Sequence, residues 1–232
     1  MKIDFHVHTN RSVDGVHSPR EMVKKARKTG LDAIAICDHN RIFPVHEAKS
    51  LTKEFGLMVI LGIEGGNIAI EKHWIALGIC RQISAIRIND ILDTLRQENC
   101  ISIAPHPHTR LGFDAVESLN GSEPWSNRQV RNSTGVPEVA GSDYQALPML
   151  GFCWTKVEAD GTLESILESI RQGQCTPEGS TIPFLEIIRF YPLYIRYRLL
   201  QQPAAAYAAV RQVIGDVRRV RACESSVLSC RI

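Results

Sequence analysis

The chain has 232 residues, of which 44% are hydrophobic, and its formal net charge at pH 7 is +2. This length suffices for one barrel domain with a full core or for two small domains. Its seven cysteines are odd in number and form no C-x-x-C pair, which argues against a disulfide framework and favours a reducing compartment. We find no stretch of about 18 apolar residues and no signal-peptide-like start, so we expect a cytoplasmic protein without an ordinary transmembrane helix.

The opening residues predict a strand with metal-ligating side chains. Asp4, His6 and His8 occupy alternate positions and are separated by apolar residues. Side chains at positions i and i+2 of a strand share one face. We therefore expect the two imidazoles and the carboxylate to share a face, with the apolar residues on the other.

Strand and helix signals alternate after this strand. A capping box of Ser18 and Glu21, with Pro19 at the first helical position, predicts a helix over 18–29. Asn89 and Thr162 are the expected caps of two later helices. The other predicted elements are a helix over 45–55, strands over 32–37, 57–63, 73–79, 100–104 and 136–141, and an irregular segment over 109–131 with one short strand at most. Such alternation favours a parallel sheet, closed or open.

Acidic and histidine residues follow the apolar runs at the predicted strand ends. They are Asp38 and His39 after 34–37, Glu64 after 59–63, His106 and His108 after 101–104, and Asp143 after 136–141. Buried polar groups cost several kcal/mol unless they are paired or ligate a metal. Their repetition therefore predicts a multinuclear metal site on an α/β barrel.

These motifs, taken as an ordered set, resemble the successive motifs of the PHP family, named after polymerase and histidinol phosphatase. The motifs are Asp-Phe-His-Val-His-Thr at 4–9, Cys-Asp-His-Asn at 37–40, Gly-Ile-Glu at 62–64, Ala-Pro-His-Pro at 104–107 and Ala-Gly-Ser-Asp at 140–143. The resemblance covers residues 1–179. It implies a distorted seven-stranded, TIM-like β/α barrel and a phosphoesterase site with two or three divalent ions of zinc, manganese, iron or magnesium.

The resemblance also implies a ligand set for each ion. The first ion would take His6, His8, Glu64 and Asp143, the second would take Glu64, His73 and His106, and the third would take Asp14, His39 and a histidine two residues after Asp143. That last position holds Gln145, whose neutral amide oxygen is a poor substitute for imidazole on a transition metal. We expect a third site that is weakened, empty or filled by a hard ion such as Mg²⁺ or Mn²⁺.

Two carboxylates and two arginines are the candidate catalytic and substrate-binding residues. Glu64 would bridge two metals, and Asp143 would hold or polarise the nucleophilic water. Arg41 and Arg110 follow the candidate ligand loops and would grip a phosphate, or else they are solvated loop residues. Asp38 is placed to accept a hydrogen bond from a ligating imidazole.

The second expected region, residues 180–232, is a basic tail. It holds eight arginines, no lysine and three acidic residues, whereas the preceding 179 residues carry a net charge of −3. The favoured interpretation is a terminal helix docked on the barrel. Contact with an anionic membrane comes next, and binding to a nucleic-acid backbone is the third alternative.

The sequence thus predicts a metal-dependent phosphoesterase that acts on a small phosphorylated substrate or a short nucleic acid. Two alternatives remain. One is an amidohydrolase-type metal hydrolase, whose barrel also begins with a His-x-His strand. The other is a degenerate, non-catalytic scaffold that binds metal.

Overall fold

The computed structural model describes residues 1–67, 72–83, 87–105, 112–122, 135–143 and 149–183, together with residues 185, 186, 188, 189 and 192. The chain forms two compact units, Met1–Pro183 and Phe184–Ile232. The first unit contains every helix and strand named below. The domain boundary expected after residue 179 and the role of the tail stay predictions, because most of the second unit lies outside the described residues.

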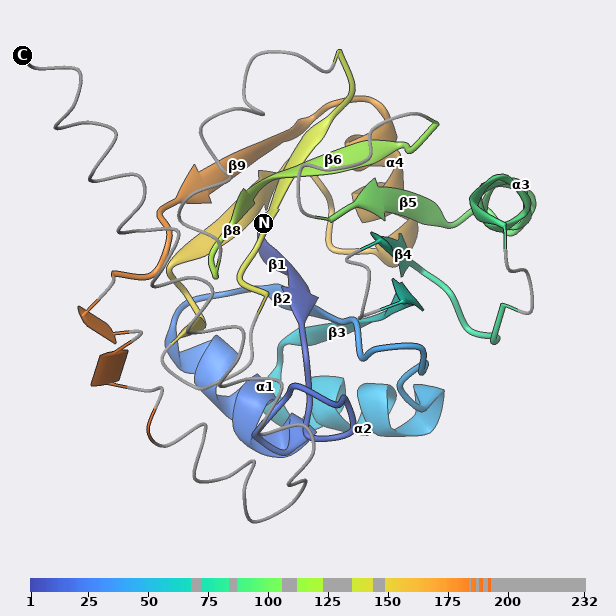
Figure 1. The fold of residues 1–232 in the computed structure, drawn as a ribbon. Coiled ribbons are helices and arrows are strands. Elements are labelled where there is room, and N and C mark those ends of the chain that lie inside the picture. Colours follow the sequence, from blue (N-terminus) through green and yellow to red (C-terminus); the bar gives the residue numbers. More distant parts are fainter. Residues whose placement is uncertain are drawn as a thin grey trace, which may run out of the picture. The chain divides into compact units, whose positions relative to one another are not determined.

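The elements alternate along the first unit (Figure 1). The helices are α1 (Pro19–Lys28), α2 (Val45–Phe55), α3 (Ile88–Gln97) and α4 (Leu163–Arg171). The strands are β1 (Lys2–Val7), β2 (Ala33–Ile36), β3 (Met58–Asn67), β4 (Lys72–Leu77), β5 (Ile101–Ala104), β6 (Ala115–Asn120), β7 (Glu138–Gly141), β8 (Cys153–Val157) and β9 (Cys175–Gly179). None of the helices within the described ranges is long and apolar enough to cross a membrane.

The nine strands found in the described residues form one mixed sheet in the order β7-β6-β5-β4-β3-β2-β1-β8-β9. The seven-strand count and the parallel sheet expected from the sequence are therefore corrected. Strand β4 runs antiparallel to both β3 and β5, and β8 runs antiparallel to both β1 and β9. Only residues 68–71 separate β3 from β4, and strands joined by so short a connection run antiparallel.

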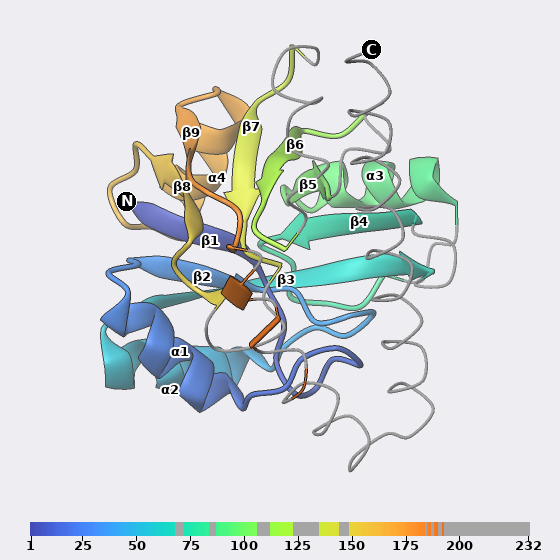
Figure 2. The same ribbon diagram turned by 60° about the vertical axis from the view of Figure 1, so that its left-hand side comes forward.

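The sheet curls until it is nearly closed, because β7 lies against β1, β8 and β9 (Figure 2). Side-chain hydrogen bonds join β7 and the residues that follow it to β8 and β1. The backbone N–H of Ala140 donates to Thr155 Oγ1 at 2.7 Å, and the Thr155 hydroxyl donates to the Ala140 carbonyl at 3.1 Å. The N–H of Ser142 donates to Asp4 Oδ1 at 2.9 Å. The result is a barrel-like α/β fold.

Helices cover the outside of this sheet. Residues Met22 and Val23 of α1 pack with Leu51 of α2 against Ile34 and Ile36 of β2. The α1 capping box is confirmed, since Ser18 accepts from the Glu21 N–H and the Glu21 carboxylate accepts from the Ser18 N–H.

Of the caps predicted for two later helices, one is confirmed and one is wrong. Thr162 caps α4 as expected and accepts from the N–H of Ser165. The cap of α3 is Arg87, so Asn89 lies in the first turn, and that expectation was wrong.

Strand β1 departs from strict alternation. Asp4 pairs with Ile34 and Val7 pairs with Ile36, so the register shifts between the two pairs. The expectation that Asp4 shares the face of the two histidines is therefore wrong. Its Oδ1 instead accepts the backbone N–H groups of His6 at 3.2 Å and of Ser142 at 2.9 Å.

Candidate metal centre

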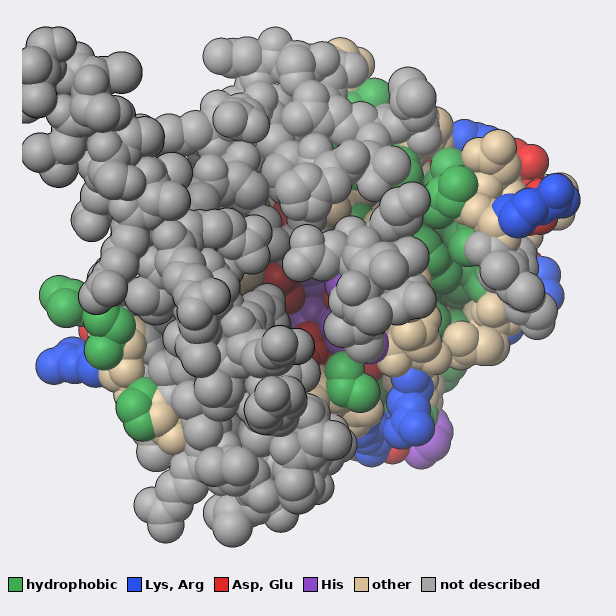
Figure 3. All heavy atoms as spheres, viewed as in Figure 1, with side chains coloured by type: hydrophobic (Ala, Val, Ile, Leu, Met, Phe, Trp, Pro, Cys, Tyr) green, Lys and Arg blue, Asp and Glu red, His purple; other side chains and the backbone are tan. Residues whose placement is uncertain are grey.

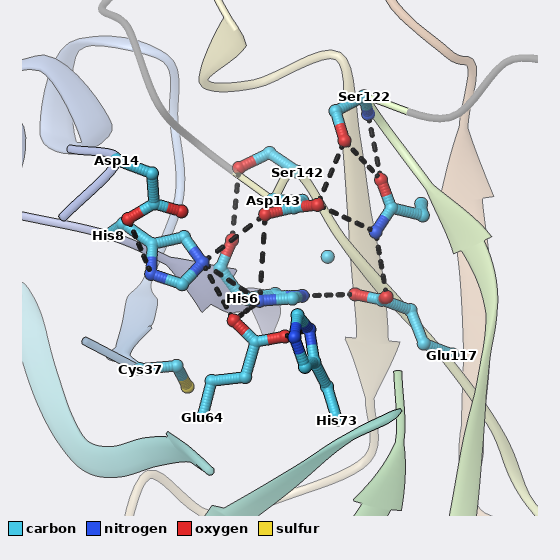
Figure 4. Close-up of polar contacts among 12 residues, drawn as sticks. His6, His8, Asp14, Cys37, Glu64, His73, Glu117, Ser122, Ser142 and Asp143 are labelled. Atoms are coloured by element: carbon cyan, nitrogen blue, oxygen red, sulfur yellow. Dashed lines mark hydrogen bonds and ion pairs between the residues drawn. The ribbon is translucent and has the colours of Figure 1, made fainter. Parts of the chain in front are cut away.

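Four side chains from three separate strands meet at one end of the sheet (Figure 4). His6 lies in β1, His8 directly follows it, Glu64 lies in β3, and Asp143 follows β7. All four are buried, with exposed fractions of 0%, 0%, 1% and 6%. Figure 3 shows acidic and histidine side chains gathered near the centre of the visible face. Residues far apart in the sequence thus form one polar cluster.

The distances among their donor atoms fit a four-coordinate divalent ion. His6 Nε2 and His8 Nε2 lie 3.0 Å apart, and each lies 3.3 Å from Glu64 Oε2. Asp143 Oδ1 lies 3.7 Å from His6 Nε2 and 3.3 Å from His8 Nε2. Ligand atoms about 2.1 Å from a tetrahedral zinc lie about 3.4 Å from one another. The imidazole and carboxylate donors also suit zinc, iron or manganese.

Backbone features explain how Asp143 reaches the histidines. Asp143 has φ +48°, a left-handed conformation that is uncommon for a residue other than glycine. Two residues earlier, a Cβ atom on Gly141 would lie 2.3 Å from His6 Cβ and 2.5 Å from Glu117 Oε1. The end of β7 can therefore approach β1 only because residue 141 has no side chain.

Glu64 also faces a second group of donors. Its Oε1 lies 2.8 Å from His73 Nδ1, and its Oε2 lies 3.3 Å from His39 Nδ1. Ligand atoms of His39, Glu64 and His73 lie within 4.8 Å of one another. The two oxygens of Glu64 thus point to different neighbours, as a carboxylate between two ions would. His106, the remaining expected ligand here, lies outside the described residues.

A third group contains His8, Asp14 and His39, whose ligand atoms also lie within 4.8 Å of one another. Asp14 Oδ2 is 3.1 Å from His39 Nε2, and Asp14 Oδ1 is 3.7 Å from His8 Nδ1. The Ser12 hydroxyl donates to Asp14 Oδ1 at 2.5 Å. Asp14 and His39 are therefore close, as expected for the third site, and Gln145 lies outside the described residues.

The electrostatics of the cluster favour a cation. Burial lowers the pKa of His8, but the carboxylates of Asp14, Asp143 and Glu64 outweigh it and raise that pKa from 6.5 to about 9. The pKa of His6 is likewise raised well above 6.5, because neighbouring carboxylates, Glu117 first among them, outweigh its burial.

The carboxylate of Asp14 shifts in the opposite direction. Burial alone would raise its pKa, but His8, His39 and the Ser12 hydroxyl lower it from 3.8 to about 2. Protonated imidazoles thus balance the buried carboxylates in the metal-free protein. A divalent ion would supply the same positive charge.

Sequence reasoning missed three residues next to this cluster: Glu117 and Asn120 in β6, and Ser122 just after it. Glu117 Oε1 lies 3.0 Å from His6 Nδ1, and Asn120 Nδ2 donates to Glu117 Oε2 at 2.9 Å. Their segment was expected to be irregular with one short strand at most, and β6 is such a strand. The available signal was a lone glutamate between Val116 and Ser118, which also suits an exposed strand.

Other candidates take different roles. Asp38 was expected to hold a ligating imidazole, but its two oxygens accept from the Thr9 N–H at 2.6 Å and the Thr9 hydroxyl at 2.7 Å. It therefore fixes the loop that follows His8. Arg41 is exposed, and Arg110 lies outside the described residues.

Comparisons with known proteins agree with this architecture. Residues 4–120 match the PHP domain and residues 126–175 match the PHP-associated domain. The uncharacterized protein MJ1587 of Methanocaldococcus jannaschii is 33% identical over 175 residues, which cover 66% of this chain and 97% of that relative. A 5'-3' exoribonuclease of Haemophilus influenzae is 40% identical over 78 residues, which cover 34% of this chain and only 26% of the exoribonuclease.

Solved structures share the fold at low identity. One is a two-domain protein from Bacteroides vulgatus that contains a predicted PHP-like metal-dependent phosphoesterase. It has a TM-score of 0.65 at 17% identity, over 82% of this chain and 68% of that chain. An amidohydrolase from Chromobacterium violaceum has a TM-score of 0.53 at 13% identity, over 82% of this chain and 96% of that chain. At these identities the likeness concerns the fold alone.

Proposed function

Because the chain belongs to the PHP domain family, we propose that it hydrolyses a phosphate ester with a metal-activated water. The observation that carries this proposal is the position of Glu64. One of its oxygens faces His6 and His8, and the other faces His73. A carboxylate so placed joins two groups of imidazoles, as a binuclear hydrolase site requires.

Most of these residues would coordinate the metal ions, and one of them would also orient the attacking water. His6, His8, Glu64 and Asp143 would hold the first ion, and Glu64 and His73, with His106, would hold the second. Bound divalent ions supply Lewis acidity, which lowers the pKa of a coordinated water and neutralises charge on phosphate oxygens. Asp143, whose Oδ1 faces both histidines of β1, would orient that water for attack on phosphorus.

The number and identity of the ions belong to this proposal as well. We expect two tightly held ions of zinc, manganese, iron or magnesium. The third position has Asp14 and His39 close together, but its last expected ligand is the amide of Gln145. A third ion should therefore exchange easily or be absent after dialysis.

The proposed substrate is a small phosphorylated molecule or a short nucleic acid. The match to an exoribonuclease favours the latter but spans about a quarter of that enzyme, so it argues only for shared phosphoester chemistry. Arg41 and Arg110 are proposed to grip the phosphate, as guanidinium groups do through paired hydrogen bonds. We also propose a cytoplasmic location.

A second candidate is amide hydrolysis, which the fold shared with an amidohydrolase favours. Both activities would use the same metal-held water, so the assay must separate them. The third alternative is a scaffold that binds metal without catalysis. It predicts bound metal with neither activity.

The deciding experiment is a hydrolysis screen with Zn²⁺, Mn²⁺, Fe²⁺ and Mg²⁺ in turn. Substrates are histidinol phosphate, nucleotide phosphates, short oligonucleotides and a panel of amides. We expect metal-dependent phosphate-ester cleavage. Glu64→Gln keeps the size of the side chain and removes its charge, so it should abolish this cleavage while the circular dichroism spectrum is unchanged. Full turnover by metal-loaded Glu64→Gln, or cleavage of amides only, would contradict the proposal.

A further inference from the structure

A chain of hydrogen bonds links β6 to two of the proposed metal ligands (Figure 4). Glu117 Oε1 lies 3.0 Å from His6 Nδ1, on the side of the ring away from the other ligands. Asn120 Nδ2 donates to Glu117 Oε2 at 2.9 Å and to Asp143 Oδ2 at 3.3 Å. The Ser122 hydroxyl lies 2.9 Å from the same Asp143 oxygen. One strand thus contacts ligands that come from β1 and from the end of β7.

The orientation of the Asn120 amide is fixed by its other end. Asn120 Oδ1 accepts the N–H of Ser122 at 2.9 Å and lies 2.8 Å from the Ser122 hydroxyl. Only the amide nitrogen can then face Glu117 and Asp143. Since a carboxylate accepts but cannot donate, this nitrogen is the group that lets the two buried carboxylates stay close together.

We propose that Glu117, Asn120 and Ser122 are positioning residues that orient His6 and Asp143 for the first metal. This inference rests on the metal binding proposed above and deepens it. A carboxylate on His6 Nδ1 keeps the proton on that nitrogen and turns the lone pair of Nε2 toward the metal. Donors on Asp143 Oδ2 leave Oδ1, the atom that faces His6 and His8, as the ligating oxygen.

Burial makes the arrangement specific. Glu117 and Asn120 are 2% and 0% exposed, so water does not replace a lost partner at low cost. Glutamine at position 117 would have one acceptor where the network needs two, for His6 Nδ1 and for Asn120 Nδ2. At the other contact, the amide N–H of the glutamine would face a second N–H group, from His6 or from Asn120. Outer partners of this kind contribute about 10- to 100-fold to metal affinity.

The test measures Zn²⁺ affinity of the full chain by competition with a chromophoric chelator. The variants are Glu117→Gln and Ser122→Ala. The matched control is Ser118→Ala, because Ser118 lies in the same strand, is 1% exposed and has a hydroxyl without a hydrogen-bond partner among the described residues. The melting temperature of each metal-free protein is recorded beside the affinity. The ¹⁵N shifts of the His6 ring nitrogens in the zinc-loaded protein report which nitrogen carries the proton.

We expect Glu117→Gln to bind Zn²⁺ about 10- to 100-fold more weakly and to change the His6 ring shifts. Ser122→Ala should bind several-fold more weakly, and Ser118→Ala should bind as the unmodified protein does. Unchanged affinity in both network variants would overturn the inference and leave the proposed function intact. If Glu117→Gln does not fold, Ser122→Ala decides alone. An unmodified protein that binds no Zn²⁺ would overturn the proposed function and this inference together.

Discussion

At the level of single residues, the site concentrates imidazoles and carboxylates in a largely buried cluster. Four histidines, His6, His8, His39 and His73, each have a ring nitrogen within 4 Å of a carboxylate oxygen of Glu64 or Asp14. Charges held this close and buried must balance, by protons or by metal ions. Proton and metal therefore compete for the same nitrogen atoms.

This competition predicts a pH dependence for His8, whose pKa is raised from 6.5 to about 9. In the metal-free protein, its protonated form contributes stability that is fully present below pH 6.5 and is lost as the pH rises through about 9. Zn²⁺ needs the neutral ring, so its affinity should rise with pH over this interval, by about tenfold per pH unit for each imidazole that must lose a proton. Chelator competition and thermal unfolding check both trends, which should be smaller in His8→Gln. A Zn²⁺ affinity that is independent of pH would contradict this account.

The second prediction for a single residue concerns the close approach of β7 to β1 at Gly141. The Cβ of Gly141→Ala would lie 2.3 Å from His6 Cβ, so β7 must move away from β1. We expect a loss of about 1–3 kcal/mol in unfolding free energy and weaker Zn²⁺ binding. Gly30→Ala is the control, since Gly30 has a positive φ but nothing within 4 Å of its Cβ position. The control should lose stability alone. Equal Zn²⁺ affinity in both variants would argue against a close approach at Gly141.

At the level of elements, the helices support the site from outside and do not contribute ligands. The capping box of α1 illustrates their local determinants, because Ser18 and Glu21 satisfy each other's backbone N–H groups. The buried face of this helix consists of Met22, Val23 and Ala26. Stability of the helix and chemistry of the site should therefore be separable.

Ser18→Ala tests this separation. Loss of the cap should cost about 1 kcal/mol, which lowers the melting temperature by about 2–4 °C in a chain of this size. Hydrolysis per folded molecule should be unchanged. Ser50→Ala, at an exposed position inside α2, is the matched control and should be slightly stabilising, because alanine has the higher helix propensity. If Ser18→Ala melts no earlier than Ser50→Ala, the cap contributes nothing measurable.

At the level of the whole molecule, the two compact units differ in charge. Residues 184–232 carry eight arginines and three acidic residues, whereas the first 183 residues carry a net charge of −3. We propose that the basic unit gives weak contact with anionic surfaces, separate from hydrolysis. The strand β9 and the buried Ile182 belong to the first unit, so a cut after Pro183 respects its packing.

A chain ending at Pro183 should keep metal-dependent hydrolysis and lose binding to vesicles of phosphatidylserine and phosphatidylcholine. The physical reason is electrostatic attraction of about 1 kcal/mol for each arginine near an anionic surface. Sedimentation with vesicles measures it, and phosphatidylcholine vesicles are the control. Binding to a single-stranded oligonucleotide in place of vesicles would favour the nucleic-acid alternative. A truncated chain that does not fold would show that the tail is part of the core.

Several features of this protein followed from sequence alone because their determinants are local. The α1 cap depends on residues three positions apart, and α2 has the expected bounds, 45–55, and ends at Gly56. His6 and His8 could be nominated from their alternate positions in the opening strand, and Glu64 and Asp143 from their positions after apolar runs. Local order along the chain carries this information, since strand ends meet at one edge of a barrel.

Other features were decided only by the tertiary structure. The antiparallel pairings of β4 and of β8 depend on contacts between separate segments, which short runs such as Cys153–Val157 do not encode by themselves. The shift in β1 moved Asp4 away from the histidine face. Glu117 looks like any strand glutamate until folding brings it 3.0 Å from His6, 111 residues away. Burial and proximity, which are properties of the packed chain, give that carboxylate its proposed role.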